Sequence, residues 1–466
     1  MAETLQTDYL IVGAGAMGMA FADVLVEETD ADIVIVDRYG KPGGHWNVAY
    51  PFVTLHQPSS FYGVSSLELS KGRKDKTGLN AGLQDLASGA EVSAYFDEVM
   101  RHRLLPSGRV RYFPLCDYVG DGRFVSRLHG KAYQVEASKK TVDATYLNTS
   151  TPATHKPSFS IADGVRFAPV GELPSLHQPA SGFVIIGGGK TGIDAVIWLL
   201  ENGVDPDMIR WIMPRDGWLI NRQKTQPSME FFEQTMGGQA DQMQAIAEAA
   251  DIDDLFGRLE KAEVMFRIDQ DIKPSMFHGA TVSAMELEQL RRVKNIIRLG
   301  RVSAIEHDRI VLADGDIPTD AGQLHIDCSA SAITNLETRP IFDGDTITPQ
   351  TVRSYQPVFS AALIAHVEAA YETEEEKQAL CQVVPLPNHV TDWPAMTAAF
   401  MMNQYRWSQD KALRAWLRDN RLDGFSELTS GYDKNDAAKH DIMQRLRANM
   451  MPAMANLQKL MASNAT

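Results

Sequence analysis

Short apolar runs that end in clustered glycines occur twice along the chain. One run covers residues 8–12 and the other residues 183–186, and each is followed by a longer stretch rich in Ala, Met, Ile and Leu. A short run that is apolar throughout is typical of a strand buried on both faces, and the longer stretch predicts a helix. Both regions therefore predict a strand, a tight turn and a helix, which is the building unit of an α/β fold.

Other parts of the chain have different patterns. Alternation of apolar and polar residues predicts antiparallel strands over 111–137 and a hairpin over 299–315. Residues 230–266 have the period of helices, and their Met, Phe and Ile side chains form either ordinary core, the commoner case, or the roof of a substrate channel. A further helix is predicted to begin at Pro357, and amphipathic helices are predicted over 393–422.

The glycines of the first turn have the spacing G-x-G-x-x-G, at Gly13, Gly15 and Gly18. In a dinucleotide site the first glycine allows the turn, the second lets the backbone approach a pyrophosphate, and the third lets helix and strand pack closely. The next apolar run ends at Asp37, nineteen residues after Gly18, where a carboxylate accepts hydrogen bonds from a ribose. Arg38 is either a ligand of the adenine end or an exposed loop charge. This combination predicts a dinucleotide site.

The segment GKPGGHWN at 40–47 follows directly. Two adjacent glycines before His45 and Trp46 indicate a backbone that lies close to a flat group, with an aromatic side chain beside it. For Trp46, ordinary core packing is an equally good interpretation.

The second turn repeats the glycine spacing at Gly187, Gly189 and Gly192. The strand after its helix ends in Arg215, where a site for NADH would have a carboxylate. A guanidinium suits the 2′-phosphate of NADPH, so NADPH is favoured, with Arg222 and Lys224 as additional candidate ligands. The alternative is that Arg215 lies in a surface loop and that Asp216 is the ribose ligand.

Composition and charge limit the classes of function. The formal net charge is −15, from 45 Lys and Arg against 60 Asp and Glu, which disfavours a general nucleic-acid binder because phosphate binding needs a basic face. Cys116, Cys328 and Cys381 are too few and too scattered for a disulfide framework or a cysteine-based zinc site, and no metal is expected. The chain begins without the features of a signal peptide and has no membrane-spanning apolar stretch, so a cytoplasmic protein is expected.

Together these features resemble the two-dinucleotide-binding flavoproteins, and among them the flavin-containing and Baeyer–Villiger (class B) monooxygenases. The resemblance is carried by GAGAMG at 13–18, DRYGKPGGHW at 37–46 and GGGKTGIDA at 187–195. Two weaker similarities are residues 146–159, at the position of the linker strand, and 324–332, at the position of the strand that re-enters the flavin domain. The family motif F-x-G-x-x-x-H is not reproduced, and Ser-Ala replaces Thr-Gly in 324–332.

The resemblance implies two Rossmann-like domains that bind FAD and NADPH. The FAD-binding domain would be discontinuous, 1–155 plus 325–466, and the NADPH-binding domain, 156–324, would be inserted into it and contain a helical insertion at about 228–295. The backbone near Val119 would meet the adenine. The helix that contains Ser360 would face the flavin, although Ser360 as a simple N-cap is an equal alternative. The expected FAD ligands are Gly13, Gly15, Ala16, Met17, Gly18, Asp37, Arg38, Gly44, His45, Trp46, Val119 and Ser360, and the expected NADPH ligands are Gly187, Gly189, Lys190, Thr191, Gly192, Arg215 and Arg222.

For such an enzyme the resemblance implies that NADPH reduces the flavin and that the reduced flavin binds dioxygen as a C4a-(hydro)peroxide. This species would transfer oxygen to a small-molecule nitrogen, sulfur or carbonyl. The active-site asparagine of flavin-containing monooxygenases has no clear equivalent, and His56 or Gln57 occupies its place. His45 is the third candidate to hydrogen-bond the peroxide or the substrate, and for each of the three a structural role is the commoner alternative.

Two other classes share both nucleotide sites. A disulfide reductase needs a cysteine pair near the flavin, and the sequence has none. An NADPH-dependent reductase that passes electrons to a carrier protein needs no such pair and is the alternative function. The expected partners are a small-molecule substrate and dioxygen, without nucleic acid or membrane, and with a homodimer left open as the assembly.

Overall fold

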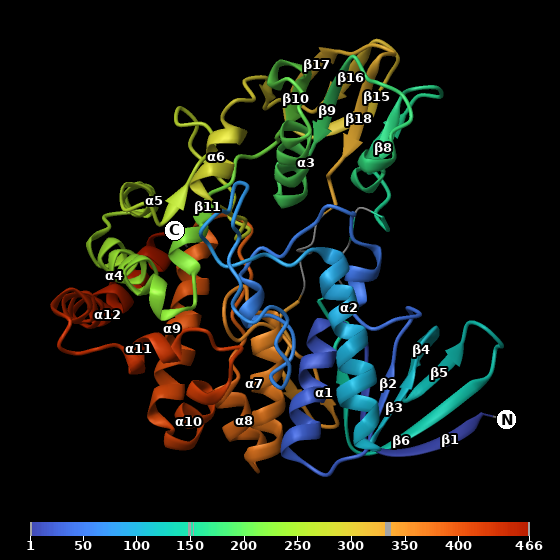
Figure 1. The fold of residues 1–466 in the computed structure, drawn as a ribbon, viewed down its shortest axis with the longest axis vertical. Helices are drawn as coiled ribbons and strands as arrows, with labels where there is room; N and C mark the ends of the chain where they lie inside the picture. Colours follow the sequence, from blue (N-terminus) through green and yellow to red (C-terminus); the bar gives the residue numbers. More distant parts are fainter. Residues whose placement is uncertain (1, 148–150, 152, 331–336, 465–466) are drawn as a thin grey trace.

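A computed structural model describes residues 2–147, 151, 153–330 and 337–464 (Figure 1). Its elements form three groups. A sheet with the N-terminal strand lies at the lower right of the view, a second sheet lies at the top, and helices from the middle and the end of the chain lie at the left (Figure 1). The two sheets confirm the expected α/β class.

The first sheet is built around the N-terminal strand, in the order β19-β20-β6-β1-β2-β3, with β4 and β5 attached at β6. Its strands are β1 (Glu3–Val12), β2 (Ile33–Val36), β3 (Val110–Phe113), β4 (Cys116–Gly120), β5 (Arg123–Ser126), β6 (Ala132–Asp143), β19 (Phe342–Asp343) and β20 (Thr346–Ile347). β1 pairs in parallel with β2 and β6, whereas β4, β5 and β6 are antiparallel. The predicted antiparallel strands are therefore confirmed from Cys116 onward. For the residues of β3 the prediction is wrong, because β3 pairs in parallel with β2.

Three helices pack on this sheet: α1 (Ala16–Glu28), α2 (Gly89–Val99) and α7 (Pro357–Ala370). α1 and α7 lie side by side although more than 300 residues separate them (Figure 1). Phe21 of α1, Phe96 of α2 and Leu363 of α7 are fully buried in one apolar core with Ile11 of β1. The helix predicted to begin at Pro357 is confirmed.

The second sheet has the order β14-β10-β9-β18-β8, and all its pairs are parallel. Its strands are β8 (Phe167–Pro169), β9 (Gly182–Ile186), β10 (Ile209–Ile212), β14 (Ile296–Ile297) and β18 (Gln323–Asp327), with helices α3 (Lys190–Glu201) and α6 (Ala284–Leu290). A small sheet beside it contains β7 (Ser160–Ile161), β15 (Val302–Ile305), β16 (Arg309–Leu312) and β17 (Gly315–Pro318). The antiparallel pairing of β15, β16 and β17 confirms the predicted hairpin.

β18 corrects one expectation about the path of the chain. Residues 324–332 were expected to include the strand that re-enters the first domain, but β18 pairs with β9 and β8 in the second sheet. The chain returns to the first sheet only at β20, which pairs with β6. That expectation is wrong because the apolar run LHID is buried between two strands of the second domain, and residues 331–332 lie outside the described part of the chain.

The remaining elements form the third group. They are α4 (Phe232–Glu248), α5 (Ile252–Lys261), α8 (Glu374–Leu380), α9 (Trp393–Gln409), α10 (Lys411–Asp419), α11 (Ser426–Gly431) and α12 (Ala437–Asn464), with the short strands β11 (Leu219–Asn221), β12 (Met265–Phe266) and β13 (Thr281–Val282). α4 lies against α12 (Figure 1), and Met236 and Ile246 on α4 are fully buried. The apolar stripe of the insertion is therefore core. Within the described residues, no helix has the length and hydropathy to cross a membrane.

Candidate functional site

The first glycine turn joins β1 to α1 and has the geometry that a dinucleotide requires. Gly13 has φ = +100°, and a Cβ there would lie 2.8 Å from Thr145 Cγ2. A Cβ on Gly18 would lie 2.0 Å from the Gly13 carbonyl oxygen, so helix and strand are in direct contact. In the described part of the chain, a Cβ on Gly15 would have one neighbour within 4 Å, Gly44 Cα at 3.7 Å. The turn therefore leaves space at Gly15, where the backbone can approach a pyrophosphate.

Asp37, which directly follows β2, lies at this turn with only 5% of its surface exposed. Its carboxylate accepts hydrogen bonds from the N–H groups of Ala14 and Tyr39, each at 2.6 Å. Burial raises the pKa of Asp37, and these N–H groups oppose the increase. Because a carboxylate offers about four acceptor positions, two remain for ribose hydroxyls. Arg38 is exposed and lies over the Tyr39 ring, as its loop-charge interpretation expected.

The adjoining loop brings Gly44, His45 and Trp46 to the same turn. The Gly43 N–H donates to the Ala14 carbonyl at 2.8 Å, which holds the loop against the start of α1. Trp46 Nε1 donates to the Tyr62 hydroxyl at 2.8 Å and packs against both domain cores. Desolvation lowers the pKa of His45 to about 4, so its imidazole is neutral near pH 7. Ala16 and Met17 form the first turn of α1.

Val119 lies on β4 with its side chain 57% exposed. The expected contact of the backbone near Val119 with the adenine stays a prediction. The residues that contact Asp37 come earlier: the Asp37 N–H donates to the Phe113 carbonyl at 3.0 Å, and the Cys116 N–H donates to the Asp37 carbonyl at 2.9 Å. The backbone that borders the candidate ribose position is therefore 113–116.

Ser360 is also placed differently from both of its interpretations. It is fully buried inside α7, and its Oγ accepts from the Val352 N–H at 3.1 Å and donates to the Gln356 carbonyl at 2.8 Å. The N-cap position of α7 is Gln356. Ser360 therefore stabilises the loop before α7 and is not free to bind a cofactor.

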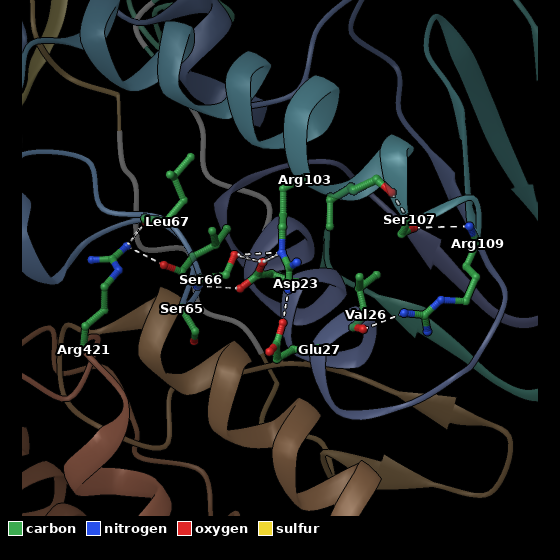
Figure 2. Close-up of polar contacts among 12 residues, drawn as sticks. Asp23, Val26, Glu27, Ser65, Ser66, Leu67, Arg103, Ser107, Arg109 and Arg421 are labelled. Atoms are coloured by element: carbon green, nitrogen blue, oxygen red, sulfur yellow. Dashed lines mark hydrogen bonds and ion pairs between the residues drawn. The ribbon is translucent and has the colours of Figure 1, made fainter.

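A polar cluster around the buried Asp23 supports α1. Asp23 on α1 accepts from the Ser66 N–H at 3.0 Å, and burial raises the pKa of this carboxyl. Arg103 lies 3.5 Å from Asp23 and also donates to Ser66 Oγ at 3.1 Å, and Figure 2 shows the three side chains pointing toward one another. Arg421 donates to the Leu67 carbonyl at 2.6 Å from the C-terminal part of the chain (Figure 2). These contacts fix the loop at 64–67 on the helix that carries the first turn.

The second glycine turn repeats the first in backbone detail. Gly187 has φ = +129°, and a Cβ there would lie 2.5 Å from the Cys328 carbonyl oxygen. A Cβ on Gly192 would lie 2.1 Å from the Gly187 carbonyl oxygen. Among the residues that the structure describes, nothing lies within 4 Å of a Cβ on Gly189. The second turn therefore also has close packing at its third glycine and open space at the position where a pyrophosphate would bind.

The start of α3 is connected to the first domain. The Tyr50 hydroxyl donates to Asp194 Oδ2 at 2.6 Å, and the same carboxylate pairs with Lys190. Thr191 is within hydrogen-bond reach of the Tyr50 hydroxyl. Because Tyr50 follows the loop of Trp46, the two glycine turns are joined by one short segment of the chain.

Arg215 and Asp216 point to different surroundings. Arg215 Nη2 donates to Asn388 Oδ1 at 2.9 Å. Asp216 is buried, and both of its carboxylate oxygens accept from Arg298, at 2.7 and 2.9 Å. The carboxylate that was the alternative ribose ligand is thus already paired inside the protein.

Arg222 is fully buried and does not join Arg215. It donates to the His56 carbonyl at 2.6 Å and forms an ion pair with Glu286 at 3.0 Å. The expectation that Arg222 contacts a 2′-phosphate is not supported, because these internal partners occupy its guanidinium. Its contact with His56 links the second domain to the candidate catalytic loop.

A cavity of about 790 Å³ lies next to Arg215. Its lining residues come from both domains and from the C-terminal segment: Tyr146, Leu147, Arg215, His278, Arg301, Glu337, Thr338, Gln350, Thr351, Val383, Val384, Pro385, Leu386, Asn388, His389 and Asp392. In the described part of the chain, neither Arg215 nor Arg301 has an ion pair to a carboxylate. This arrangement favours an anionic group in the cavity.

Sequence reasoning missed Arg301, His278 and Asn388. The sequence could have indicated Arg301 as a ligand, because it follows the apolar pair Ile296–Ile297. The carboxyl ends of parallel strands meet at one edge of a sheet, and Arg215 lies at the same edge. Asn388 lies 173 positions from Arg215, and no local pattern connects them.

His56 lies between the two turns. Its side chain is accessible, yet desolvation by the surrounding protein lowers its pKa well below the usual value, and the charges of Lys190 and Arg222 lower it further. Gln57 instead donates to the Phe61 carbonyl at 3.4 Å within its own loop. Within the described residues, His56 is the candidate catalytic residue that accepts a hydrogen bond from the second domain, through its backbone carbonyl, to which Arg222 donates. No group of three or more metal-ligating side chains is present among the described residues.

Comparison with known proteins agrees with this architecture. The family described as pyridine nucleotide-disulphide oxidoreductase matches residues 10–230. Uncharacterized protein Rv2000 of Mycobacterium tuberculosis and uncharacterized protein Mb2023 of Mycobacterium bovis are each 44% identical over 466 residues, which is 100% of this chain and 86% of theirs.

Solved structures with related folds are more distant. An oxidized steroid monooxygenase bound to NADP has a TM-score of 0.49 at 14% identity and covers 78% of this chain and 85% of its own. A flavin-containing monooxygenase from Stenotrophomonas maltophilia has a TM-score of 0.43 at 14% identity, covering 82% and 100%. Bacillithiol disulfide reductase from Bacillus cereus has a TM-score of 0.43 at 11% identity, covering 79% and 100%. At this level of similarity they do not identify an activity for this chain.

The resemblance to two-dinucleotide-binding flavoproteins is confirmed by the family match together with the two glycine turns. The family match over residues 10–230 and the two turns agree with the expected class of flavin- and pyridine-nucleotide-dependent oxidoreductases, and with FAD and NADPH as the expected cofactors. Cys116, Cys328 and Cys381 are all buried and unpaired. None of the three cysteines therefore forms the redox-active disulfide that a disulfide reductase needs.

Proposed function

Since the chain belongs to the same family as these mycobacterial proteins, we propose one function for the fold that they share. In this function the chain is an FAD- and NADPH-dependent monooxygenase that oxygenates a nitrogen, a sulfur or a carbonyl group of a small molecule. The observation that carries the proposal is that the segment with His45 and His56 connects the two glycine turns: the Tyr50 hydroxyl donates to Asp194 at the start of α3, and Arg222 donates to the His56 carbonyl at 2.6 Å. Oxygen transfer requires a site where bulk water is kept from the reacting groups. Desolvation keeps His45, beside the first turn, neutral near pH 7.

FAD would be held by the first turn. The backbone at Gly15 and the start of α1 would bind the pyrophosphate, and the free acceptor positions of Asp37 would bind the ribose. The open space at Gly15 fits this group, because a side chain there would occupy it. When bound, FAD supplies hydride acceptance and dioxygen activation.

NADPH would be held by the second turn. Gly189 has the space for the pyrophosphate, and Arg215 and Arg301 would bind the 2′-phosphate by charge-assisted hydrogen bonds. The ion pair between Asp216 and Arg298 supports NADPH over NADH, because it removes the carboxylate that would bind the two free hydroxyls of NADH.

His56 would act as a hydrogen-bonding group. A neutral imidazole has one donor and one acceptor nitrogen, and the lowered pKa keeps His56 neutral near pH 7. It can therefore orient the substrate or the reacting oxygen without carrying a positive charge. Lys190 and Arg222 supply positive charge nearby while the imidazole remains neutral.

The test is rapid mixing of the FAD-loaded protein. The protein is reduced by NADPH without oxygen, mixed with oxygenated buffer, and followed by absorption with amines, thioethers and ketones supplied as substrates. We expect a transient absorbing species before reoxidation and an oxygenated product. Direct return to oxidised flavin, with rapid NADPH oxidation only when an electron acceptor is added, would replace the proposal with an electron-transfer reductase.

Variants of the candidate loop sharpen this test. We expect His56→Ala to shorten the lifetime of the transient species while leaving flavin reduction by NADPH within about threefold of the parent rate, because removal of one hydrogen-bonding group costs about 1–3 kcal/mol where that group is used. Gln57→Ala is the matched control, since Gln57 bonds only within its own loop. Equal lifetimes in the two variants would remove His56 from the proposed site.

A further inference from the structure

We propose that Asn388 is a specificity-determining residue of the pyridine nucleotide site. Its side chain holds Arg215 and His278 side by side and leaves the charge of Arg215 available to a 2′-phosphate. The inference rests on the proposed function, because it concerns the same NADPH site. Asn388 belongs to the segment between α8 and α9, far from both glycine turns in the sequence. The C-terminal part of the chain thereby takes part in nucleotide recognition.

One amide oxygen connects the two side chains. Asn388 Oδ1 accepts from Arg215 Nη2 at 2.9 Å and lies 2.9 Å from His278 Nε2. An amide oxygen only accepts hydrogen bonds, so His278 donates through its Nε2–H. Both donors are thus fixed on one point at the wall of the cavity, which all three residues line.

Asn388 is itself held in place. Asp392 Oδ2 accepts from the backbone N–H groups of Asn388 and His389, at 3.0 and 2.8 Å. The Val390 N–H donates to the Ser275 carbonyl at 3.2 Å, which attaches the segment to the chain just before His278. The side chain of Asn388 therefore has a fixed position relative to the second domain.

The neutral amide explains why this position orients Arg215 without cancelling its charge. Arg298 at the same edge of the sheet is paired with two carboxylates, Asp216 at 2.7 Å and Asp269 at 3.1 Å. Arg215 has an uncharged partner in Asn388 instead. Burial, and after it the like charge of Arg301, lowers the pKa of Arg215.

Burial also lowers the pKa of His278, with the charges of Arg215 and His389 adding to it and the Asn388 hydrogen bond opposing it. His278 is therefore a neutral donor. Both cationic arginines of the cavity then lack a negative partner in the described part of the chain, and a dianionic phosphate would supply one.

The experiment measures the Kd values of NADP⁺ and NAD⁺ for the FAD-loaded protein by titration. Asn388→Asp places a carboxylate of the same shape on Arg215, so we expect the Kd of NADP⁺ to rise about tenfold or more and its salt dependence to weaken, while the Kd of NAD⁺ changes less than about twofold. Asn388→Ala removes the orientation without adding charge, and we expect a rise of about threefold for NADP⁺ alone.

The variant Arg215→Ala distinguishes a failure of the proposed NADPH site from a failure of the role of Asn388. If Arg215→Ala leaves the ratio of the two Kd values unchanged, the proposed NADPH site is wrong. If Arg215→Ala lowers the discrimination and Asn388→Asp binds both nucleotides like the parent protein, the role of Asn388 is wrong and the proposed function stands. The flavin spectrum and the thermal midpoint of each variant establish that it is folded, and Asn388→Ser replaces any variant that is not.

Discussion

The two glycine turns have the same backbone arrangement, but they differ in the charged residue that follows the next strand along the chain. In the first, the carboxylate of Asp37 bonds to the N–H of Ala14, within the turn itself. In the second, Arg215 lines a cavity, whereas Asp216 is buried against Arg298. The backbone of such a turn determines where a dinucleotide can bind, and the side chain after the next strand determines which dinucleotide is preferred.

The turns also differ slightly at their second glycine. A Cβ on Gly15 would lie 3.7 Å from Gly44 Cα, whereas no described residue lies within 4 Å of a Cβ on Gly189. Both distances leave the backbone open to a pyrophosphate, so the difference between the two sites lies in their charges.

Substitution of the third glycine in either turn should have the largest effect. In Gly18→Ala and Gly192→Ala the new methyl group would lie 2.0 and 2.1 Å from a backbone oxygen, so we expect a loss of about 3 kcal/mol or more in the free energy of unfolding. Denaturant unfolding of each variant is the measurement. Gly189→Ala is the matched control, with unchanged stability and a higher KM for NADPH; equal stability of all three would contradict the packing argument.

Removal of the charge at the second site should have the next largest effect. We expect Arg215→Ala to raise the KM for NADPH about 10–100-fold and to leave the KM for NADH nearly unchanged, because a charge-assisted hydrogen bond contributes about 1.5–3 kcal/mol. Arg301→Ala, in the same cavity but more exposed, should give a rise of about threefold. A similar loss for both nucleotides in an Arg215→Ala variant with the parent flavin spectrum and thermal midpoint would contradict the assignment of Arg215 to the 2′-phosphate.

At the first site, Asp37→Asn should weaken FAD binding about tenfold, measured by the flavin released on dilution. The amide keeps one acceptor oxygen but presents an NH₂ group to either Ala14 or Tyr39, and it loses acceptor positions for the ribose. Binding of NADP⁺ to the variant reloaded with excess FAD should be unchanged. Parent-like FAD affinity would mean that the ribose is bound elsewhere.

The smallest effect concerns pH and His45. Its pKa falls from 6.5 to about 4 in the folded protein, so between these values the unfolded chain binds more protons and stability decreases as the pH falls. We expect His45→Gln to lessen this decrease between pH 6.5 and 4, as followed by thermal midpoints. Identical pH profiles would place His45 in a more solvated environment than the structure gives it.

Much of the fold could be predicted because its signals are local. The starts of α1, α3 and α7 follow from glycines or proline in contiguous stretches, and the open space at Gly15 and Gly189 agrees with the roles that their spacing predicts. β18 was misplaced because an apolar run does not reveal which sheet buries it.

The sequence by itself determined the two turns and the opposite charges of Asp37 and Arg215, since contiguous residues fix a turn and the strand that follows it. Only the tertiary structure decided that Asp216 pairs with Arg298, that Arg222 is buried against Glu286, and that Asn388 reaches Arg215. These pairings join residues 64–173 positions apart. They depend on how separate elements pack, and a local pattern of residues does not show which distant residues come into contact.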